Sequence, residues 1–306
     1  MVEAISCAHA FAPAATPVIL YGESGTGKNF FAQYIHDLSQ RADGFHAFSV
    51  GTLSPQLAED ELFGHVPGAF TDARRARPGR IATAGSGTLL LDDLHTLDLG
   101  VQKKLLQVLD RGTYTAVGGD RLQAAACRVI LAMTDAPDTL MAKGLLLKDL
   151  RYRFGACAIA IPPLRDRRSE IPFLALRALR RCAELTKVDG PMTFSEAALA
   201  LLCEGEYEGN VRELEGIVLR AYLVARHRGA CAIAVEDLPP QFATRLQYRR
   251  HGDVEQNRMV VERVLRITGG NVKKAAQLLR VSRTTVNAAV GRSDTKRTQS
   301  DGPAGL

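Results

Sequence analysis

The spacing of apolar residues changes once along the chain, near residue 162. Before that point, short apolar runs of strand length alternate with segments whose apolar residues recur at helical spacing. The strand candidates are 17–21, 45–50, 88–93, 128–133 and 157–161. Runs without polar alternation are typical of strands covered on both faces of a parallel sheet. We therefore predict an α/β domain with a parallel sheet over residues 1–162.

Beyond residue 162 only helical spacing remains. The helical segments are 169–185, 195–204 and 209–227, so residues 163–240 are predicted to form a helical lid-like subdomain. A linker over 241–252 follows two prolines. Residues 293–306 are predicted to be disordered because they are polar and contain Gly, Pro and Ser.

Residues 253–292 carry the pattern of a helix-turn-helix. The expected helices are 254–267, 272–279 and 282–290, with Ser282 as the cap of the last one. The residues expected to face the major groove of double-stranded DNA are Arg283, Thr284, Thr285 and Asn287. Lys273 and Lys274 are expected to meet phosphate. The alternative for this module is a small helical dimerisation bundle.

The formal net charge of +6 is unevenly distributed. Residues 245–306 hold thirteen Lys and Arg against five Asp and Glu, so this segment carries +8 and residues 1–244 carry −2. A basic block that coincides with helical periodicity favours nucleic acid as a partner over a merely solvated tail.

A glycine-rich stretch lies between the first strand and a helical segment at 29–38. It consists of Gly22, Glu23, Ser24, Gly25, Thr26, Gly27 and Lys28, and Asn29 follows it. After a strand and before a helix, such a stretch is typical of a phosphate-binding loop, in which backbone N–H groups, the helix N-terminus and the lysine surround phosphates. The alternative is a tight turn with a surface lysine. Asn29 stands where most such loops carry a Ser or Thr hydroxyl for magnesium.

The strand at 88–93 ends in two carboxylates, Asp92 and Asp93. Ligands of parallel sheets bind at the carboxyl ends of the strands. Together with the glycine-rich loop, this predicts that Asp92 holds Mg²⁺ through water and that Asp93 orients the water that attacks a phosphate.

Residues 61–73 place two glycines and a proline around an aromatic residue, Phe70, and several arginines follow. This composition predicts a mobile loop with a hydrophobic tip. An ordinary surface loop whose Phe packs back on the body is the alternative.

Other classes of protein are excluded by composition. The six cysteines are scattered without a C-x-x-C pair, which argues against a zinc site or a disulfide framework. The first twenty residues lack the pattern of a signal peptide, and no apolar run approaches the length that crosses a bilayer. We therefore expect a cytoplasmic protein that has no membrane partner.

Taken together, these residues resemble the bacterial enhancer-binding proteins, which are AAA+ activators of sigma-54 RNA polymerase. The resemblance covers nearly the whole chain. Its motifs are GESGTGK at 22–28, ELFGH at 61–65, GAFTDA at 68–73, GGD at 118–120, PPLRDR at 162–167, NVRELE at 210–215 and a Fis-type module between 268 and 285. The GAFT-type loop between the two nucleotide-binding motifs is peculiar to this family among AAA+ proteins.

The resemblance implies a ring, expected to be a homo-hexamer, that binds DNA upstream of a promoter. ATP hydrolysis between neighbouring subunits would drive the Phe70 loop against sigma-54. The residues that would contact sigma-54 are Gly68, Ala69, Phe70, Thr71, Asp72 and Ala73. Residues 22–29 would bind ATP, Asp92 would organise Mg²⁺ and Asp93 would take the catalytic acidic position. Arg153 would reach the neighbour's nucleotide, and Arg212 would be the lid sensor.

Several positions depart from the family pattern. Asp93 stands in place of a Glu, Ser49 in place of the Asn that restrains it, and Asp135 in place of the sensor Asn. Leu147 replaces the first of two trans-acting arginines, and Asp72 replaces the second Gly of the loop motif. The resemblance includes no receiver or ligand-sensing domain. Control is therefore expected from expression, a separate regulatory protein or a co-assembled paralogue.

These departures leave a second hypothesis open, because several of them surround one γ-phosphate. It is a DNA-binding regulator or hetero-oligomer partner that binds ATP but turns it over poorly. A third hypothesis, an AAA+ chaperone or helicase loader, explains neither the GAFTDA loop nor the C-terminal module.

Overall fold

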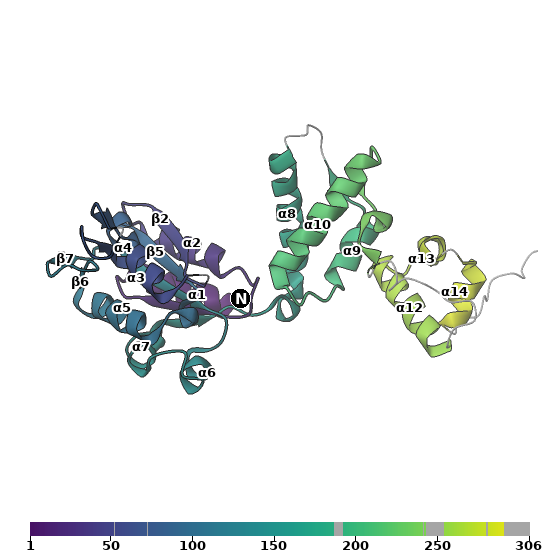
Figure 1. Cartoon of the computed structure of the whole chain (residues 1–306). Coiled ribbons are helices and arrows are strands. Elements are labelled where there is room, and N and C mark those ends of the chain that lie inside the picture. Colours follow the sequence, from purple (N-terminus) through teal and green to yellow (C-terminus); the bar gives the residue numbers. More distant parts are fainter. Residues whose placement is uncertain are drawn as a thin grey trace, which may run out of the picture. The chain divides into compact units, whose positions relative to one another are not determined.

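The structure of the 306-residue chain is a computed structural model. It describes residues 1–51, 53–71, 73–186, 192–240, 242, 254–279 and 281–290 (Figure 1). The chain divides into two compact units. The first is Met1–Arg167 with Gly209–Arg212, and the second is Arg168–Glu208 with Glu213–Leu306.

The first unit alternates strands and helices. Its strands are β1 (Val18–Tyr21), β2 (Phe45–Ser49), β3 (Gly64–His65), β4 (Arg77–Pro78), β5 (Thr88–Asp92), β6 (Thr113–Thr115), β7 (Leu122–Ala124), β8 (Arg128–Met133) and β9 (Ala158–Ala160). Its helices are α1 (Val2–Phe11), α2 (Lys28–Ser39), α3 (Pro55–Phe63), α4 (Arg80–Thr83), α5 (Leu99–Arg111), α6 (Pro137–Ala142) and α7 (Lys148–Phe154). Short 3₁₀ turns are η1 (Leu94–Thr96), η2 (Gly155–Cys157) and η3 (Leu164–Asp166).

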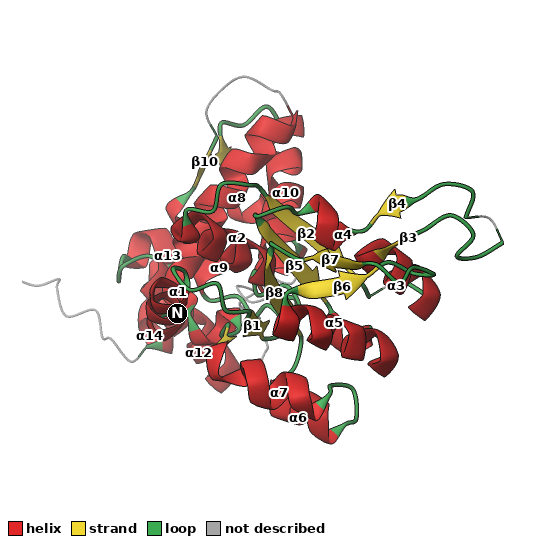
Figure 2. Cartoon of the chain, turned by 90° about the vertical axis from the view of Figure 1, so that its left-hand side faces the viewer, coloured by secondary structure: helices red, strands yellow, loops and turns green. Residues whose placement is uncertain are grey.

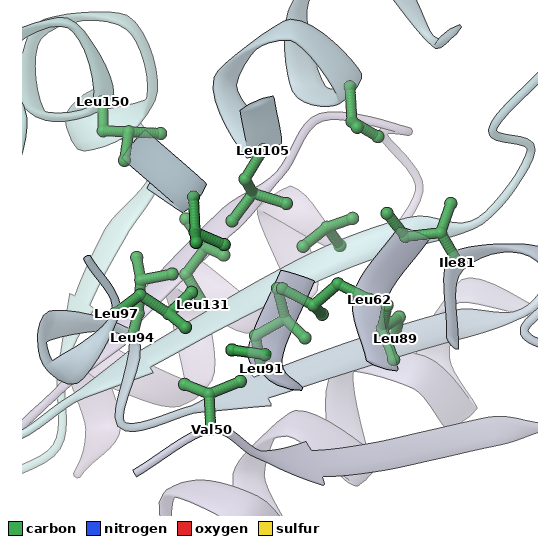
Figure 3. Close-up of a cluster of buried hydrophobic side chains, with 14 of the residues drawn as sticks. Val50, Leu62, Ile81, Leu89, Leu91, Leu94, Leu97, Leu105, Leu131 and Leu150 are labelled. Atoms are coloured by element: carbon green, nitrogen blue, oxygen red, sulfur yellow. The ribbon is translucent and has the colours of Figure 1, made fainter. Parts of the chain in front are cut away.

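Five of these strands form one parallel sheet in the order β2-β5-β8-β1-β9. Alternate residues of β5 serve opposite faces, as the pleat requires. Leu89 and Leu91 pack with α3, α4, α5, α6 and α7 on one face, and Figure 3 shows part of this cluster. Leu90 packs with α1 and α2 on the other face. The predicted parallel-sheet α/β domain is therefore confirmed, and burial on both faces explains why its strands lack polar alternation.

The first unit departs from the sequence-based prediction around residues 55–78. We expected a loop over 61–73, but Glu61 to Phe63 are the last turn of α3, which begins after its cap Ser54 and has Pro55 in its first turn. Gly64 and His65 then form β3, which pairs antiparallel with β4. Figure 2 shows β3 and β4 leading away from the main sheet. We call residues 64–78 the arm.

In the residues that the structure describes, the second unit consists of helices and one small parallel pair of strands. Its elements are η4 (Arg168–Glu170), α8 (Ile171–Thr186), β10 (Thr193–Phe194), α9 (Glu196–Cys203), α10 (Asn210–His227, whose first turn belongs to the first unit), β11 (Ala232–Ile233), η5 (Val235–Asp237), α12 (Val254–Ile267), α13 (Val272–Leu279) and α14 (Arg283–Ala289). The helical lid and the helix-turn-helix are thus confirmed, with Ser195 and Ser282 accepting cap hydrogen bonds at α9 and α14. Apart from Phe242, the predicted linker at 241–252 lies outside the described residues, as does the predicted tail.

Candidate functional site: a nucleotide site and an exposed arm

The predicted nucleotide-binding residues follow three neighbouring strands of the sheet. Gly22 to Gly27 follow β1, Asp135 comes shortly after β8, and Asp92 and Asp93 end β5. Because all three strands are parallel, their carboxyl ends lie at one edge of the sheet. The fold therefore brings these groups, which are far apart in sequence, to a common edge.

The backbone of the glycine-rich loop can be formed only by residues without a side chain at two positions. Gly22 has φ of +151° and Gly25 has φ of +76°, both in the region that L side chains rarely adopt. A Cβ at Gly22 would collide with the carbonyl oxygen of Ile161, and one at Gly25 with that of Gly209. The loop is therefore packed backbone to backbone against two other segments.

Lys28 begins α2 and is only 7 % exposed. Its Nζ donates to the carbonyl oxygens of Gly22 (2.8 Å) and Glu23 (3.2 Å). Burial lowers the pKa of its ammonium, while the carboxylates of Asp92 and Asp93 oppose this shift. A buried cation at the N-terminus of a helix, with two carboxylates near it, is suited to a phosphate and its counterion.

Two residues from distant segments, Arg165 and Asn210, hold Glu23 and Ser24 of the glycine-rich loop, and we call these four residues the Glu23 cluster. Arg165 binds the Glu23 carboxylate with two parallel hydrogen bonds of 2.8 Å and 2.5 Å. Asn210 donates its Nδ2 to Glu23 (3.1 Å) and to the Ser24 carbonyl oxygen (3.0 Å). The hydrogen bond from Arg165, followed by that from Asn210, lowers the pKa of Glu23 from 4.5 to about 2.

Asn210 also joins the loop to the segment after β9. Its Oδ1 accepts from the backbone N–H of Leu164 at 2.8 Å, its φ is +55°, and its side chain is buried. Asn tolerates the left-handed region better than most residues, which suits it to this position. Arg212, the predicted lid sensor, donates to the Ser24 hydroxyl at 3.1 Å. Arg167 donates to the Thr26 carbonyl oxygen at 2.6 Å.

The two carboxylates of β5 have different settings. Asp92 accepts a hydrogen bond from the backbone N–H of Asp93 at 3.0 Å. Asp93 itself has φ of +62°, in the left-handed region. A Cβ at Gly51 would come within 3.1 Å of Asp93 Oδ2, so the Asp93 side chain lies close to the backbone that follows β2.

The other predicted catalytic residues are ion-paired within the first unit. Asp135 accepts from Lys143 Nζ at 2.8 Å, and Arg153 forms an ion pair with Asp110. Neighbouring Arg151 binds Asp138 at 2.6 Å and 2.9 Å. Arg153 must therefore exchange its carboxylate partner if it is to bind a phosphate.

The arm exposes the predicted aromatic residue. Phe70 is 46 % exposed, whereas Ala73 is buried and donates its N–H to the Phe70 carbonyl oxygen at 2.9 Å. Gly68 has φ of +82° and donates to Ala73 at 2.7 Å, which closes the tip. The turn of the β6–β7 hairpin lies against it, since a Cβ at Gly118 would be 2.7 Å from the Ala69 Cβ. Thr71 is exposed, and Asp72 lies outside the described residues.

The predicted DNA-contacting residues lie on α13 and α14. Lys273 and Lys274 are exposed near the start of α13, and Arg283 is exposed as the first residue of α14. The hydroxyls of Thr284 and Thr285 lie 2.6 Å and 2.7 Å from the Ser282 hydroxyl, so both take part in the cap of α14. Asn287 lies one turn further along this helix.

Comparison with protein families assigns all three parts of the chain. Residues 1–160 match the "Sigma-54 interaction domain", more than half of the sequence. The chain belongs to the sigma-54 activator family. Residues 165–255 match the "AAA+ ATPase lid domain", and residues 254–289 match "Bacterial regulatory protein, Fis family".

Curated members of this family are similar over most of the chain. The Nif-specific regulatory protein of Rhizobium leguminosarum bv. trifolii is 40 % identical over 226 residues, which are 73 % of this chain and 63 % of the relative. The transcriptional regulatory protein ZraR of Salmonella typhimurium is 33 % identical over 290 residues, 92 % of this chain and 64 % of ZraR. The chain thus spans less than two thirds of the length of these relatives.

Solved structures share the fold. NtrX from Brucella abortus has been crystallised in complex with ADP and with ATP, at 23 % and 24 % identity and TM-scores of 0.72 and 0.73 to this chain. Each alignment covers 95 % of this chain and 67 % of NtrX. At this identity, the likeness establishes the architecture of this sigma-54 activator family member.

Sequence reasoning missed the contacts that fix the site. Arg165 and Asn210 belong to motifs that the sequence displays, but no local pattern indicates that they meet at Glu23, 142 and 187 residues away. No local sequence pattern indicates a role for His65 of the ELFGH motif either. His65 lies beside Phe70, with 4.9 Å between the ring centroids.

Proposed function

We propose that this protein activates transcription by sigma-54 RNA polymerase, using ATP hydrolysis to move the arm. The observation that carries the proposal is that one compact unit holds both a phosphate loop and an arm with an exposed aromatic residue. The arm is inserted between β2 and β5, so it is covalently tied to the strand that ends in Asp92 and Asp93.

ATP fits the residues present. Gly22 and Gly25 leave no room for side chains beside the loop backbone, and buried Lys28 has two carbonyl partners that a phosphate can replace. Residues 22–29 would hold the phosphates, and Arg212 would act from the start of α10. The part of the chain that the structure describes has no cluster of three or more His, Cys, Asp or Glu able to hold a metal.

A single carboxylate near a phosphate loop nevertheless fits Mg²⁺, which binds few protein groups and keeps several waters. When bound, Mg²⁺ would neutralise charge on the phosphates, and Asp92 is the residue to hold it. Asp93 would orient the attacking water. The left-handed backbone of Asp93 and its place beside Gly51 determine where its carboxylate lies, and the Asp side chain is one methylene shorter than the Glu of the family. Arg153 would leave Asp110 and stabilise charge on the nucleotide bound to a neighbouring copy of the chain. This role requires that the copies form a ring, and we propose that the ring is a hexamer.

The arm would carry the contact to sigma-54 through residues 68–73, with Phe70 at its centre. Aromatic residues commonly supply the largest share of binding free energy at interfaces. Two exposed arginines, Arg74 and Arg75, flank this segment. Coupling of the arm to the nucleotide would convert hydrolysis into movement of sigma-54. With sigma-54 RNA polymerase and DNA as its partners, the protein would act in the bacterial cytoplasm.

The helix-turn-helix would bind an upstream DNA site. Arg283 is the test residue because it is exposed at the start of α14 and takes no part in the Ser282 cap. Arg283→Ala should weaken binding to the operator about tenfold or more in a gel-shift assay, since a base contact by Arg contributes about 1–3 kcal/mol. Arg258→Ala on α12, which removes the same charge, is the control. Equal effects of the two substitutions would discard the groove assignment.

One experiment tests the activator proposal as a whole. ATP hydrolysis by the purified chain is measured over a range of protein concentrations, beside Asp93→Ala, and open-complex formation is measured with sigma-54 polymerase. We expect turnover per subunit to rise with concentration, because Arg153 acts on a neighbour. Turnover no higher than that of Asp93→Ala would remove the enzymatic proposal.

A second candidate is a nucleotide-binding regulator or hetero-oligomer partner with weak turnover. The favouring observation is Asp135, an acceptor-only group bound to Lys143 at the edge where the family has a donor. Under this alternative the chain binds ATP and DNA without hydrolysis, and a paralogue in the same ring supplies turnover. A direct ATP-binding measurement that finds binding, together with no turnover in the experiment above, would support this alternative.

A further inference from the structure

His65 stands at the base of the arm with an acceptor at each ring nitrogen. Its Nδ1 lies 2.6 Å from Asp60 Oδ1, on α3. Its Nε2 lies 2.9 Å from the carbonyl oxygen of Arg75, on the returning limb of the arm. Its ring meets Phe70 in an edge-on contact, with 4.9 Å between centroids and 66° between planes. One side chain therefore contacts the helix before the arm, the tip, and the limb after it.

A neutral His65 ring has too few hydrogen-bond donors for the two acceptors that it meets. A carboxylate and a carbonyl oxygen only accept, and a neutral imidazole has a single N–H. Both contacts are hydrogen bonds only when one more proton is present, which gives an imidazolium beside a carboxylate. The side chains of His65 and Asp60 are 10 % and 11 % exposed, so water is poorly placed to replace the contact between these two, whereas the contact of Nε2 with the Arg75 carbonyl oxygen lies at the surface.

The surrounding charges accommodate that proton. On α3, Asp60 faces the ring directly, and Glu61 binds Arg77 at 2.6 Å and Arg80 at 2.8 Å. On β4, Arg77 lies 3.7 Å from the other oxygen of Asp60. On the side of the β6–β7 hairpin, β3 forms a backbone bridge between His65 and Val117. Asp60 is therefore the carboxylate that balances a protonated His65, and Glu61 is occupied by two arginines.

We propose that protonated His65 is a positioning residue that ties the two limbs of the arm together and sets how Phe70 is presented. Loss of the proton breaks one of its two hydrogen bonds and releases the aromatic tip, so that engagement of sigma-54 weakens as pH rises. The part that concerns sigma-54 rests on the proposed function above; the part that concerns the arm does not.

The first test uses fluorescence and needs no partner. The chain contains no tryptophan, so Phe70→Trp introduces a single indole beside His65. A protonated imidazole in contact with an indole quenches its emission. We expect the emission of Phe70→Trp to rise with pH in the folded full-length chain, and this rise to vanish when His65→Gln is added. The same pH profile with and without His65 would overturn the proposal.

Asp60→Asn sharpens this test. An Asn amide can donate to a neutral Nδ1 while Nε2–H still binds the Arg75 carbonyl, so both contacts form without the extra proton. Added to Phe70→Trp, Asp60→Asn should raise the emission at low pH and flatten the profile while the arm stays intact. An unchanged profile would mean that Asp60 does not stabilise the proton. Circular dichroism of each variant establishes that it is folded.

The second test measures the consequence for the partner. Binding of sigma-54 is compared for the unsubstituted chain, His65→Gln and His227→Gln, an exposed histidine at the end of α10. We expect about tenfold weaker binding for His65→Gln alone, because it loses a charged hydrogen bond and the ring contact, with ATP hydrolysis retained. Equal binding by all three would sink the assignment. If the unsubstituted chain itself fails to bind sigma-54, the proposed function falls, and the fluorescence comparison still decides the role of His65.

Discussion

The nucleotide end of the sheet and the arm are both held by charged groups, but the groups come from different distances along the chain. At the nucleotide end, Glu23 binds partners 142 and 187 residues away. In and beside the arm, His65 of β3 and Glu61 of α3 bind partners 5 to 19 residues away. The charged contacts of the glycine-rich loop therefore come from distant segments, whereas the charged contacts around the arm are local, and the arm meets a more distant segment through backbone hydrogen bonds to Val117. If hydrolysis moves the arm, as proposed, the glycine-rich loop can keep its shape, because the side chains that bind Glu23 do not come from the arm.

The largest effect is expected from substitution of Lys28, which should impair ATP hydrolysis at the nucleotide end without altering the arm. Lys28→Ala removes a buried positive charge aimed at the phosphates, so ATP hydrolysis should fall about 10²-fold or more. Lys103→Ala, an exposed lysine on α5, is the control for loss of charge. Steady-state assays of phosphate release measure both. Hydrolysis that survives Lys28→Ala would place the nucleotide elsewhere.

Substitution of Phe70 should impair the arm while leaving the nucleotide site intact. Phe70→Ala should leave ATP turnover largely unchanged while open-complex formation falls about thirtyfold or more, the effect of losing about 2 kcal/mol at the centre of an interface. Phe173→Ala removes another exposed aromatic residue, on α8, and controls for loss of apolar surface. A transcription assay on a sigma-54 promoter provides the measurement. Loss of hydrolysis itself would show that the arm belongs to the nucleotide site or to the fold.

Asn210 tests how far the nucleotide end depends on long-range contacts. Asn210→Ala leaves the Leu164 N–H and the Ser24 carbonyl without their partner, so unfolding free energy should fall by about 2–4 kcal/mol. Asn210→Gly loses the same hydrogen bonds but accepts the φ of +55°, so it should be more stable than Asn210→Ala by about 1 kcal/mol. Urea unfolding followed by circular dichroism measures the difference. A less stable Gly variant would argue against backbone strain.

The smallest effect is expected from Glu23, whose contribution to the stability of the folded state is lost at low pH. Its pKa is lowered from 4.5 to about 2, so the ionised group stabilises the folded state above pH 4.5, and this contribution is lost as pH falls towards 2. The melting temperatures of the unsubstituted chain and Glu23→Gln should therefore converge as pH falls through that range. A constant difference between the two would mean that the Arg165 contact does not depend on the charge of Glu23.

The sheet and the helix-turn-helix were predicted from the sequence because their signals are local. The apolar run of β5 and the Ser282 cap each lie within a few residues of the element they define. Helix α3 was missed although Ser54 and Pro55 are a recognisable start, because the glycines and proline that follow drew the interpretation towards a loop. The prediction that Glu61 to Phe63 belong to a loop was wrong for that reason.

The candidate site was only partly accessible from the sequence. The types of residue at the phosphate loop and after β5 indicated the chemistry, since their order along the chain is informative. The ion pairs of Asp135 and Arg153 and the left-handed backbone of Asp93 depend on tertiary contacts that no local pattern encodes. The roles assigned to these residues remain predictions.

The Glu23 cluster has a consequence for selectivity. Because folding already orders the glycine-rich loop, a ligand meets a rigid receptor and loses little conformational entropy to it. Such a receptor favours diphosphates and triphosphates alike through the groups they share. We therefore expect ADP to be bound as tightly as ATP. Release of ADP, rather than cleavage of the phosphate bond, would then limit the rate of the ATPase cycle.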